Sequence, residues 1–383
     1  MFHSSYIEIS KSALQNNIDF LKQEIGPHVQ FSSVIKGNAY GHGIEQFAPT
    51  AQECGVDHFS VFSADEAQRL LQTLPRKATI MIMGYLDNPE LEWAIQNDIE
   101  FFVFELDRLI AAADIAKKFG KRAKVHLELE TGMNRTGFDK SALEHAISTL
   151  DDCREHVELQ GVCTHFAGAE SLQNHERILD QQRNYQEQLA HLQSSGHTPR
   201  QRHTACSAAM VTYPETHLDM VRIGIMQYGF WPSPETYRQY IGQHMDKKDP
   251  LRRLINWKSR VMSLKSVPKG EYVGYGNSYQ APLDMVLAVV PVGYAWGYSR
   301  ALSNQGQVLI KGVRAGVVGI VNMNVMMVDV TNIPDVQKND EVVLLGIQGD
   351  ESITVASFGE LSTQLNYELL TRLPSNIPRY VID

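Results

Sequence analysis

Short apolar runs alternate with longer amphipathic runs between residues 31 and 224. The short runs are typical of buried strands, and they lie at 31–35, 58–62, 79–83, 100–104, 123–129, 159–164, 201–204 and 220–223. Apolar positions recur with helical spacing between them, most clearly at 64–74, 89–96, 107–119, 140–150 and 174–193. Eight strands that alternate with helices predict a parallel (β/α)8 barrel.

The rhythm changes near residue 230. The stretch 230–234 contains two prolines, and a polar stretch follows at 246–250. Beyond it, short β-type runs are separated by turn residues, at 255–263, 285–291, 307–310, 314–318, 326–330 and 341–345. We therefore predict a barrel domain at 1–242 and a mostly β domain at 243–383.

The reactive groups of a (β/α)8 barrel gather at the C-terminal ends of its strands. Five expected strand ends carry or lead into polar side chains, namely Lys36, Arg135, His165, Ser207 and Arg222. A lysine at the end of a buried strand is partly desolvated, which disfavours its ammonium form and suits it to Schiff-base chemistry. We therefore expect one site that contains these residues.

Each residue also has an ordinary structural interpretation. His165 can be a satisfied buried imidazole, either arginine can belong to an ion pair, and Ser207 can be a helix N-cap. Tyr275, within Val-Gly-Tyr-Gly, can be an aromatic residue in a β turn. Their joint fit to one site is what favours a function.

Composition narrows the class of protein. The 383 residues carry a net charge of −9, which argues against nucleic acid or an anionic membrane as partner. The four cysteines form no C-x-x-C pair and no run reaches about 18 apolar residues. We expect a cytoplasmic protein with reduced thiols, and no metal site. The Gly41-His42-Gly43 stretch lacks the third glycine of a dinucleotide-binding fingerprint.

The run from Val34 to Gly43 resembles the pyridoxal-phosphate lysine motif of alanine racemases, although that family usually has alanine at the position of Gly37. The resemblance extends over nearly the whole chain. It includes Glu130–Met133 with Arg135, Thr164–Ala167, Ser207–Ala209, Arg222 with Gly224 and Ile225, and Gly293–Ala295.

The resemblance implies that Lys36 binds pyridoxal 5'-phosphate as a Schiff base and serves as one of two bases at Cα. It implies a homodimer, because the second base, Tyr275, and the substrate-site residues Tyr294 and Met323 come from the partner subunit. Arg222 is expected against the pyridine nitrogen, Arg135 at the cofactor's phenolic oxygen and the substrate, and His165 beside them. The phosphate is expected at Tyr40, Ser207, Gly224, Ile225 and Tyr367.

The function implied is interconversion of L- and D-alanine, which supplies D-alanine for peptidoglycan. Asn324 and Trp296 replace aspartates that are usual near the substrate entrance, and Cys206 replaces a common asparagine beside Ser207. These departures leave a serine or broad-specificity racemase as an alternative. A non-catalytic pyridoxal-phosphate carrier and a barrel decarboxylase are further classes, against which Tyr275 and Arg222 argue, respectively.

Glu128 occupies the position at which several members of the family carry a carbamylated lysine. A carboxylate there could orient Arg135 directly. We therefore expect an ion pair between Glu128 and Arg135.

Overall fold

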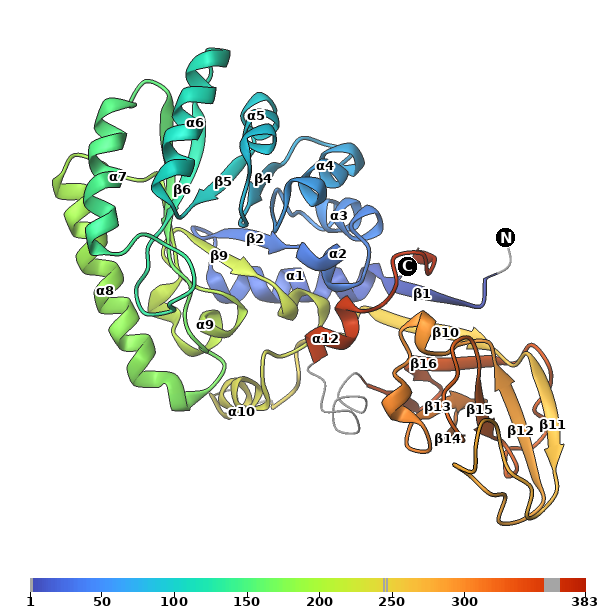
Figure 1. Ribbon diagram of the computed structural model, residues 1–383. Helices are drawn as coiled ribbons and strands as arrows, with labels where there is room; N and C mark the ends of the chain where they lie inside the picture. The colour runs from blue at the N-terminus through green and yellow to red at the C-terminus, as the bar shows by residue number, and fades with distance from the viewer. Residues whose placement is uncertain (1–2, 244, 246, 355–365) are drawn as a thin grey trace. The chain divides into compact units, whose positions relative to one another are not determined.

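The computed structural model describes residues 3–243, 245, 247–354 and 366–383 (Figure 1). These residues belong to two compact units. The barrel unit comprises residues 13–36 and 48–252. The strand unit comprises residues up to 12, residues 37–47 and residues from 253 onward. Two short segments of the N-terminal half therefore belong with the strand unit, which the apolar pattern did not indicate.

The barrel unit contains all eight predicted strands. They are β2 (Gln30–Val34), β3 (His58–Val61), β4 (Thr79–Ile82), β5 (Glu100–Val103), β6 (Ala123–Glu128), β7 (Val157–Cys163), β8 (Gln201–His203) and β9 (Met220–Ile223). They pair in parallel in the order β8-β7-β6-β5-β4-β3-β2-β9. An isolated bridge between Cys206 and Arg222 lies at the seam between β8 and β9, so the barrel is nearly closed. The predicted fold class is confirmed.

Helices follow the strands, and the five predicted helices are all present. The α-helices of the first 243 residues are α1 (Lys11–Ile25), α2 (Lys36–Tyr40), α3 (Ile44–Glu53), α4 (Ala64–Thr73), α5 (Asn88–Gln96), α6 (Leu106–Phe119), α7 (Lys140–Asp152), α8 (His175–Ser194), α9 (Ser207–Thr212) and α10 (Pro234–Gln243). Figure 1 shows α4 to α8 along the outer side of the strands. Their boundaries follow local signals: Asp87 and Glu90 form a capping box at α5, and Gly120 ends α6 in a left-handed conformation. No helix in the described ranges is long and apolar enough to cross a membrane.

The strand unit contains β1 (Ser5–Ser10), β10 (Ile255–Arg260), β11 (Ser263–Val267), β12 (Met285–Val290), β13 (Gln307–Ile310), β14 (Val313–Val318), β15 (Met326–Asp329), β16 (Glu341–Gln348), β17 (Glu351–Ile353), β18 (Arg379–Ile382) and helix α12 (Asn366–Thr371). The sheet order is β11-β12-β15-β14-β13-β16-β10-β1-β18, with β17 on β16. The predicted single strand 255–263 is two strands with different partners, because β10 pairs with β1 and β16 whereas β11 pairs with β12.

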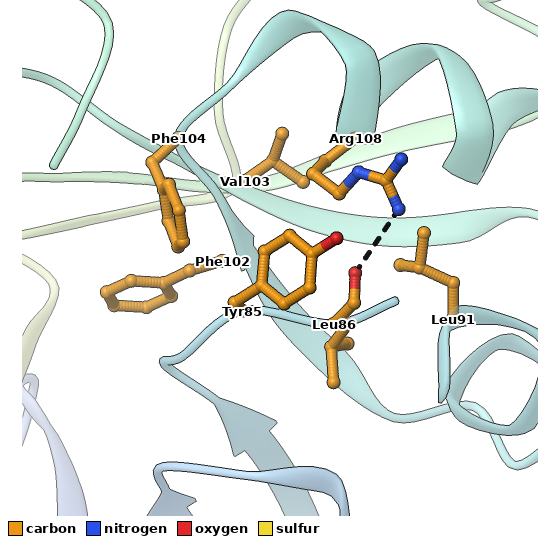
Figure 2. A pocket seen from close by; sticks show the side chains of 7 residues that line it. All are labelled: Tyr85, Leu86, Leu91, Phe102, Val103, Phe104 and Arg108. Carbon is orange, nitrogen blue, oxygen red and sulfur yellow. Dashed lines mark hydrogen bonds between the residues drawn. The ribbon is translucent and has the colours of Figure 1, made fainter. Parts of the chain in front are cut away.

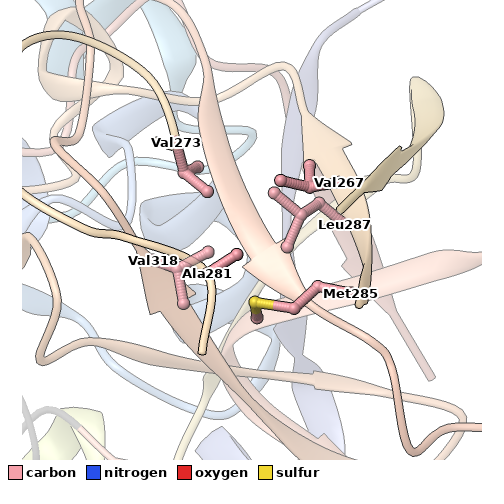
Figure 3. Packing of buried hydrophobic residues seen from close by; sticks show 6 residues of the cluster. All are labelled: Val267, Val273, Ala281, Met285, Leu287 and Val318. Atoms are coloured by element: carbon pink, nitrogen blue, oxygen red, sulfur yellow. The ribbon is translucent and has the colours of Figure 1, made fainter. Parts of the chain in front are cut away.

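A buried apolar cluster forms part of the core of the strand unit. It consists of Val267, Val273, Ala281, Met285, Leu287 and Val318 (Figure 3). Strand β12 places Leu287 in this cluster, whereas the preceding residue, Val286, faces outward and is 38% exposed. At this end of β12, Met285 and Leu287 thus lie on the core face and Val286 between them lies on the solvent side.

Replacing Leu287 by alanine should lower the free energy of unfolding by about 2–5 kcal/mol, because it removes buried methyl groups and leaves a cavity. The matched control is Val286→Ala on the same strand, with an expected change within roughly 0.5 kcal/mol. Urea unfolding followed by tryptophan fluorescence measures both. Equal losses in the two variants would contradict the assignment of the core face.

Candidate active site

The backbone turns left-handed immediately after Lys36. Gly37, Asn38, Ala39 and Tyr40 have φ values of 63°, 55°, 53° and 49°. Residues with a Cβ rarely adopt this conformation, which costs roughly 1–2 kcal/mol for each of them. Such strain persists only where surrounding contacts determine it, and it is concentrated at functional sites.

Contacts within the strand unit determine this turn. The Gly41 amide donates to the Gly37 carbonyl at 3.0 Å, and the buried Arg379 donates from Nε to the Gly41 carbonyl at 2.9 Å. Gly41 has φ +80°, and a Cβ there would lie 1.8 Å from the carbonyl oxygen of Leu370 in α12. Only glycine therefore allows α12 to approach the turn so closely.

The same packing brings together two of the predicted phosphate ligands. The rings of Tyr40 and Tyr367, the latter on α12, have centroids 6.1 Å apart. These residues are more than 300 positions apart in the chain. The strand unit therefore presents both phenols beside the strained turn.

Positive charge surrounds the Lys36 side chain in the barrel unit. This side chain retains access to solvent. Desolvation by the surrounding protein, together with the charges of Arg135 and Arg222, nevertheless lowers its pKa. The structure thus brings Lys36, Arg135 and Arg222 within electrostatic range of one another, and it favours the neutral amine that a nucleophile or base requires.

Arg222 on β9 is buried and held on two sides of its guanidinium. Nη1 donates to the Nδ1 and the carbonyl oxygen of His203, the latter at 2.9 Å. Nη2 donates to the carbonyl oxygens of Thr164 at 2.8 Å and Thr204 at 3.2 Å. Four of its five N–H groups are thus used, and no acceptor for Nε–H occurs in the described part of the chain.

Ser207 lies at the first turn of α9, but it is not the N-cap residue, which is Cys206. Its hydroxyl instead accepts a hydrogen bond from the Gly224 amide at 2.9 Å. A short 3-10 helix, Ile225–Tyr228, starts directly after Gly224. The structure therefore brings together Ser207, Gly224 and Ile225, and the leading amides of a helix are donors that lack partners within it.

Arg135 lies in the loop after β6, and Glu130 organises this loop. The Glu130 carboxylate accepts hydrogen bonds from the amides of Gly132, Asn134 and Arg135, the last two at 2.8 and 3.4 Å. From α8, Arg177 donates to the Gly132 carbonyl at 2.8 Å. Arg135 itself is an exposed residue.

The expected ion pair between Glu128 and Arg135 is wrong. No such pair within 4 Å occurs among the described residues, and the Glu128 carboxylate accepts a hydrogen bond from the Thr136 hydroxyl at 2.8 Å instead. Burial raises the pKa of Glu128, although Thr136 and Arg135 partly oppose that shift. The sequence spacing identified the loop that Glu128 contacts, but the residue that contacts Glu128 is Thr136 and not Arg135.

His165 follows β7 and is largely buried. Burial and the positive charges of Arg222, Arg135 and Lys36 lower its pKa to about 3. It is therefore a neutral imidazole near pH 7. It can take part in hydrogen bonds, but it carries no positive charge there.

The remaining predicted site residues lie on the strand unit and are exposed. Tyr275 is 72% exposed, Met323 54% and Tyr294 43%. The loops of the last two are joined, because the Tyr294 amide donates to the Asn322 carbonyl and the Ala295 amide to the Met323 carbonyl, each at 3.0 Å.

A small pocket in the barrel unit contains none of these residues. It is lined by Tyr85, Leu86, Leu91, Phe102, Val103, Phe104 and Arg108 (Figure 2). Its cavity of about 10 Å³ has room for one water molecule at most. We interpret it as a packing gap next to α5 and α6.

Sequence reasoning missed the buried polar residues that connect to Arg222. His203, His126 and Glu100 follow one another by hydrogen bonds through the barrel interior. A signal was present, because all three occur in strands that a parallel barrel buries on both faces. An ionisable side chain in such a strand requires a partner.

Two family models match consecutive parts of the chain. The family model "Alanine racemase, N-terminal domain" matches residues 9–232, and "Alanine racemase, C-terminal domain" matches residues 254–381.

Individual relatives match over almost the full length. The alanine racemase of Leptospira interrogans (serovar copenhageni, strain Fiocruz L1-130) is 37% identical, over 100% of this chain and 96% of its own. That of Methanococcus maripaludis is 34% identical, over 98% of each chain. The structure of alanine racemase from Clostridium difficile 630 superposes with a TM-score of 0.91 at 29% identity, over 100% of this chain and 96% of its own.

Replacing Glu130 by glutamine should loosen the loop that carries Arg135. One acceptor oxygen becomes an NH2 group that faces amide donors. The donors that lose their acceptor destabilise the loop by roughly 1–3 kcal/mol. Hydrogen exchange at the amides of Asn134 and Arg135 should accelerate. Glu128→Gln is the matched control, since its amide oxygen still accepts from Thr136. Faster exchange in the control alone would contradict the role given to Glu130.

The lowered pKa of His165 makes stability depend on pH. The unfolded chain binds a proton near pH 6.5, but the folded chain does so only near pH 3, so this contribution to the free energy of unfolding falls as the pH falls between those values. His165→Gln should therefore lose less stability than the wild type between about pH 7 and about pH 5. Urea unfolding at both pH values measures the difference, and equal losses would show that His165 is not held neutral.

Proposed function

The chain belongs to the alanine racemase family and is an amino-acid racemase, and on this premise we propose that it interconverts L-alanine and D-alanine with pyridoxal 5'-phosphate. We further propose a cytoplasmic homodimer with shared active sites, whose product D-alanine is used in peptidoglycan. The observation that carries the proposal is Lys36, whose pKa is lowered beside Arg135 and Arg222 at the end of a barrel strand.

The residues present fit this cofactor. A Schiff base requires an unprotonated amine, which the lowered pKa of Lys36 favours. The Ser207 hydroxyl and the Gly224 amide, 2.9 Å apart, begin two helical turns, and such groups bind phosphate without a basic residue. The paired phenols of Tyr40 and Tyr367 are further candidate phosphate ligands.

Pyridoxal phosphate, when bound, supplies an electron sink for the carbanion left at Cα. Arg222 would hold the pyridine nitrogen through its remaining Nε–H donor. A guanidinium, with a pKa above about 12, donates a hydrogen bond without transferring its proton. Arg222 would therefore keep the sink weak, which would favour return of a proton to Cα over side reactions.

Racemisation needs a proton carrier on each face of Cα. Lys36 Nζ would serve one face, helped by desolvation and by its positive neighbours, which both disfavour its protonation. Tyr275 Oη of the partner subunit would serve the other. Its exposure on the strand unit supports this, because a residue that completes another subunit's site must be accessible in its own. Tyr294 and the backbone of Met323, on adjoining loops, would bind substrate from the same side. Neutral His165 would offer Tyr275 a hydrogen bond, and Arg135 would bind the substrate carboxylate.

Lys36→Ala should abolish both covalent cofactor attachment and racemisation, because only Lys36 is proposed to bind the cofactor covalently and to carry the proton on its face of Cα. Borohydride reduction followed by peptide mass spectrometry locates the modified lysine, and chiral chromatography follows the alanine enantiomers. Lys22→Ala, at a partly exposed position of α1, is the control and should behave as wild type. A label on another lysine in the wild type would overturn the assignment.

A shared site can be tested by mixing two inactive variants. Lys36→Ala and Tyr275→Phe homodimers should each be nearly inactive. Heterodimers formed after dissociation and reassociation should regain activity, because one of their two sites then contains both Lys36 and Tyr275. A verified heterodimer without activity would argue that both bases come from one subunit.

A further inference from the structure

A buried chain of hydrogen bonds runs from Arg222 to Glu100. Arg222 Nη1 contacts His203 Nδ1, His203 Nε2 lies 2.8 Å from His126 Nδ1, and His126 Nε2 lies 3.0 Å from Glu100 Oε2. The residues come from four different barrel strands, β9, β8, β6 and β5. Each is at least nine-tenths buried.

The donors and acceptors of these hydrogen bonds fit together in only one direction. An arginine can only donate, so His203 Nδ1 must accept and its proton must be on Nε2. His126 Nδ1 must then accept from His203, which leaves the His126 proton on Nε2. That proton is donated to Glu100. A carboxylate at the far end is the acceptor that this order of protons requires.

The electrostatics agree with that assignment. Burial lowers the pKa of His126, and burial with the Arg222 charge lowers that of His203 further, so both rings are neutral near pH 7. Burial opposes ionisation of Glu100, but the interactions with His126 and His58 outweigh it and lower its pKa to about 2. These hydrogen bonds thus join the buried Arg222 cation to the buried Glu100 anion through two neutral imidazole rings.

The surroundings are shaped to hold the two rings. Phe102, which also lines the pocket of Figure 2, has its ring centroid 6.0 Å from that of His126 and 5.8 Å from that of His203. Gly161 on β7 pairs with His126, and a Cβ there would lie 2.0 Å from His126 Nδ1. A β-bulge occurs at the same point of β6. The backbone therefore leaves just enough room for this imidazole.

A metal site does not account for these residues. The lone pairs of His203 Nδ1 and His126 Nδ1 both face hydrogen-bond donors and cannot bind a cation. No group of three potential ligands with suitable geometry occurs within the described ranges. His58 Nε2 also faces Glu100, at 3.8 Å, which is too long for a hydrogen bond.

We propose that Glu100 is a remote positioning residue for Arg222. Acting through His126, Glu100 fixes the tautomer of His203 that accepts a hydrogen bond from the guanidinium. The guanidinium is thereby held with its Nε–H directed away from this network. The opposite tautomer of His203 would place an N–H against Arg222 Nη1 and displace it. The link to the reaction rests on the proposed function, in which the Nε–H of Arg222 binds the pyridine nitrogen.

The wild-type protein without cofactor tests the order of protons directly. In ¹⁵N-histidine-labelled protein, the nitrogen shifts distinguish the two neutral tautomers from the imidazolium, and His126→Asn and His203→Asn assign the signals. Both rings should be neutral with the proton on Nε2 at about pH 7. An imidazolium or a proton on Nδ1 in either ring would overturn the proposal.

Two variants then test the consequence for Arg222. Glu100→Gln keeps the shape but removes the charge, and Gly161→Ala displaces His126 without changing any hydrogen-bonding group. Each should perturb the His203 signals and lower kcat roughly 10–100-fold, with a smaller change in KM, as expected for loss of a hydrogen bond to a charged group. Ser60→Ala is the control. It removes the buried Ser32–Ser60 hydrogen bond, 2.6 Å long, which is not connected to the hydrogen bonds between Arg222 and Glu100.

The outcomes separate the proposals. If Glu100→Gln lowers stability as Ser60→Ala does, but keeps the His203 tautomer and kcat, Glu100 is merely structural and the positioning role is overturned. If the protein fails to racemise any amino acid although it binds pyridoxal phosphate, the proposed function fails. The histidine signals still decide the tautomers in that case, because they need neither cofactor nor turnover.

Discussion

A guanidinium buried inside a barrel must have its donors satisfied, and the arrangement around Arg222 follows from that requirement. An unpaired buried charge is among the costliest features that a fold can contain. Strands β7 and β8 end where their carbonyl groups can accept from Nη1 and Nη2, and His203 presents an unprotonated nitrogen. With four N–H groups fixed, the direction of the fifth is also set.

Concentrated positive charge has a second consequence. Burial disfavours the charged forms of Lys36 and His165, and the neighbouring charges of Arg135 and Arg222 add to that effect, so the pKa of each is lowered. The His165 imidazole is therefore neutral near pH 7, and the neutral form of the Lys36 amine is favoured relative to that of a free lysine. In the strand unit, glycine at position 41 lets α12 pack closely against the strained turn that follows Lys36.

The barrel was predictable because parallel strands are buried on both faces and read as continuous apolar runs. The strand ends also indicated which residues gather in the barrel site. Strand β1 was missed, although its alternating pattern was visible, because its partners β10 and β18 lie more than 240 residues away. The expected partner of Glu128 was wrong because spacing does not give side-chain direction, and Thr136 is the neighbour. The Arg222–Glu100 connection was missed because each histidine has an ordinary interpretation by itself.

Proton exchange at Cα is the chemistry on which everything else here depends. The direct measurement incubates the purified protein with pyridoxal phosphate and either L-alanine or D-alanine in deuterium oxide, followed by chiral chromatography with mass spectrometry. We expect both starting enantiomers to converge on an equal mixture, and each newly formed enantiomer to carry one deuterium at Cα. The proposed racemisation of alanine would be contradicted if protein that has bound the cofactor left L-alanine and D-alanine each unchanged. It would also be contradicted if the protein racemised serine but not alanine.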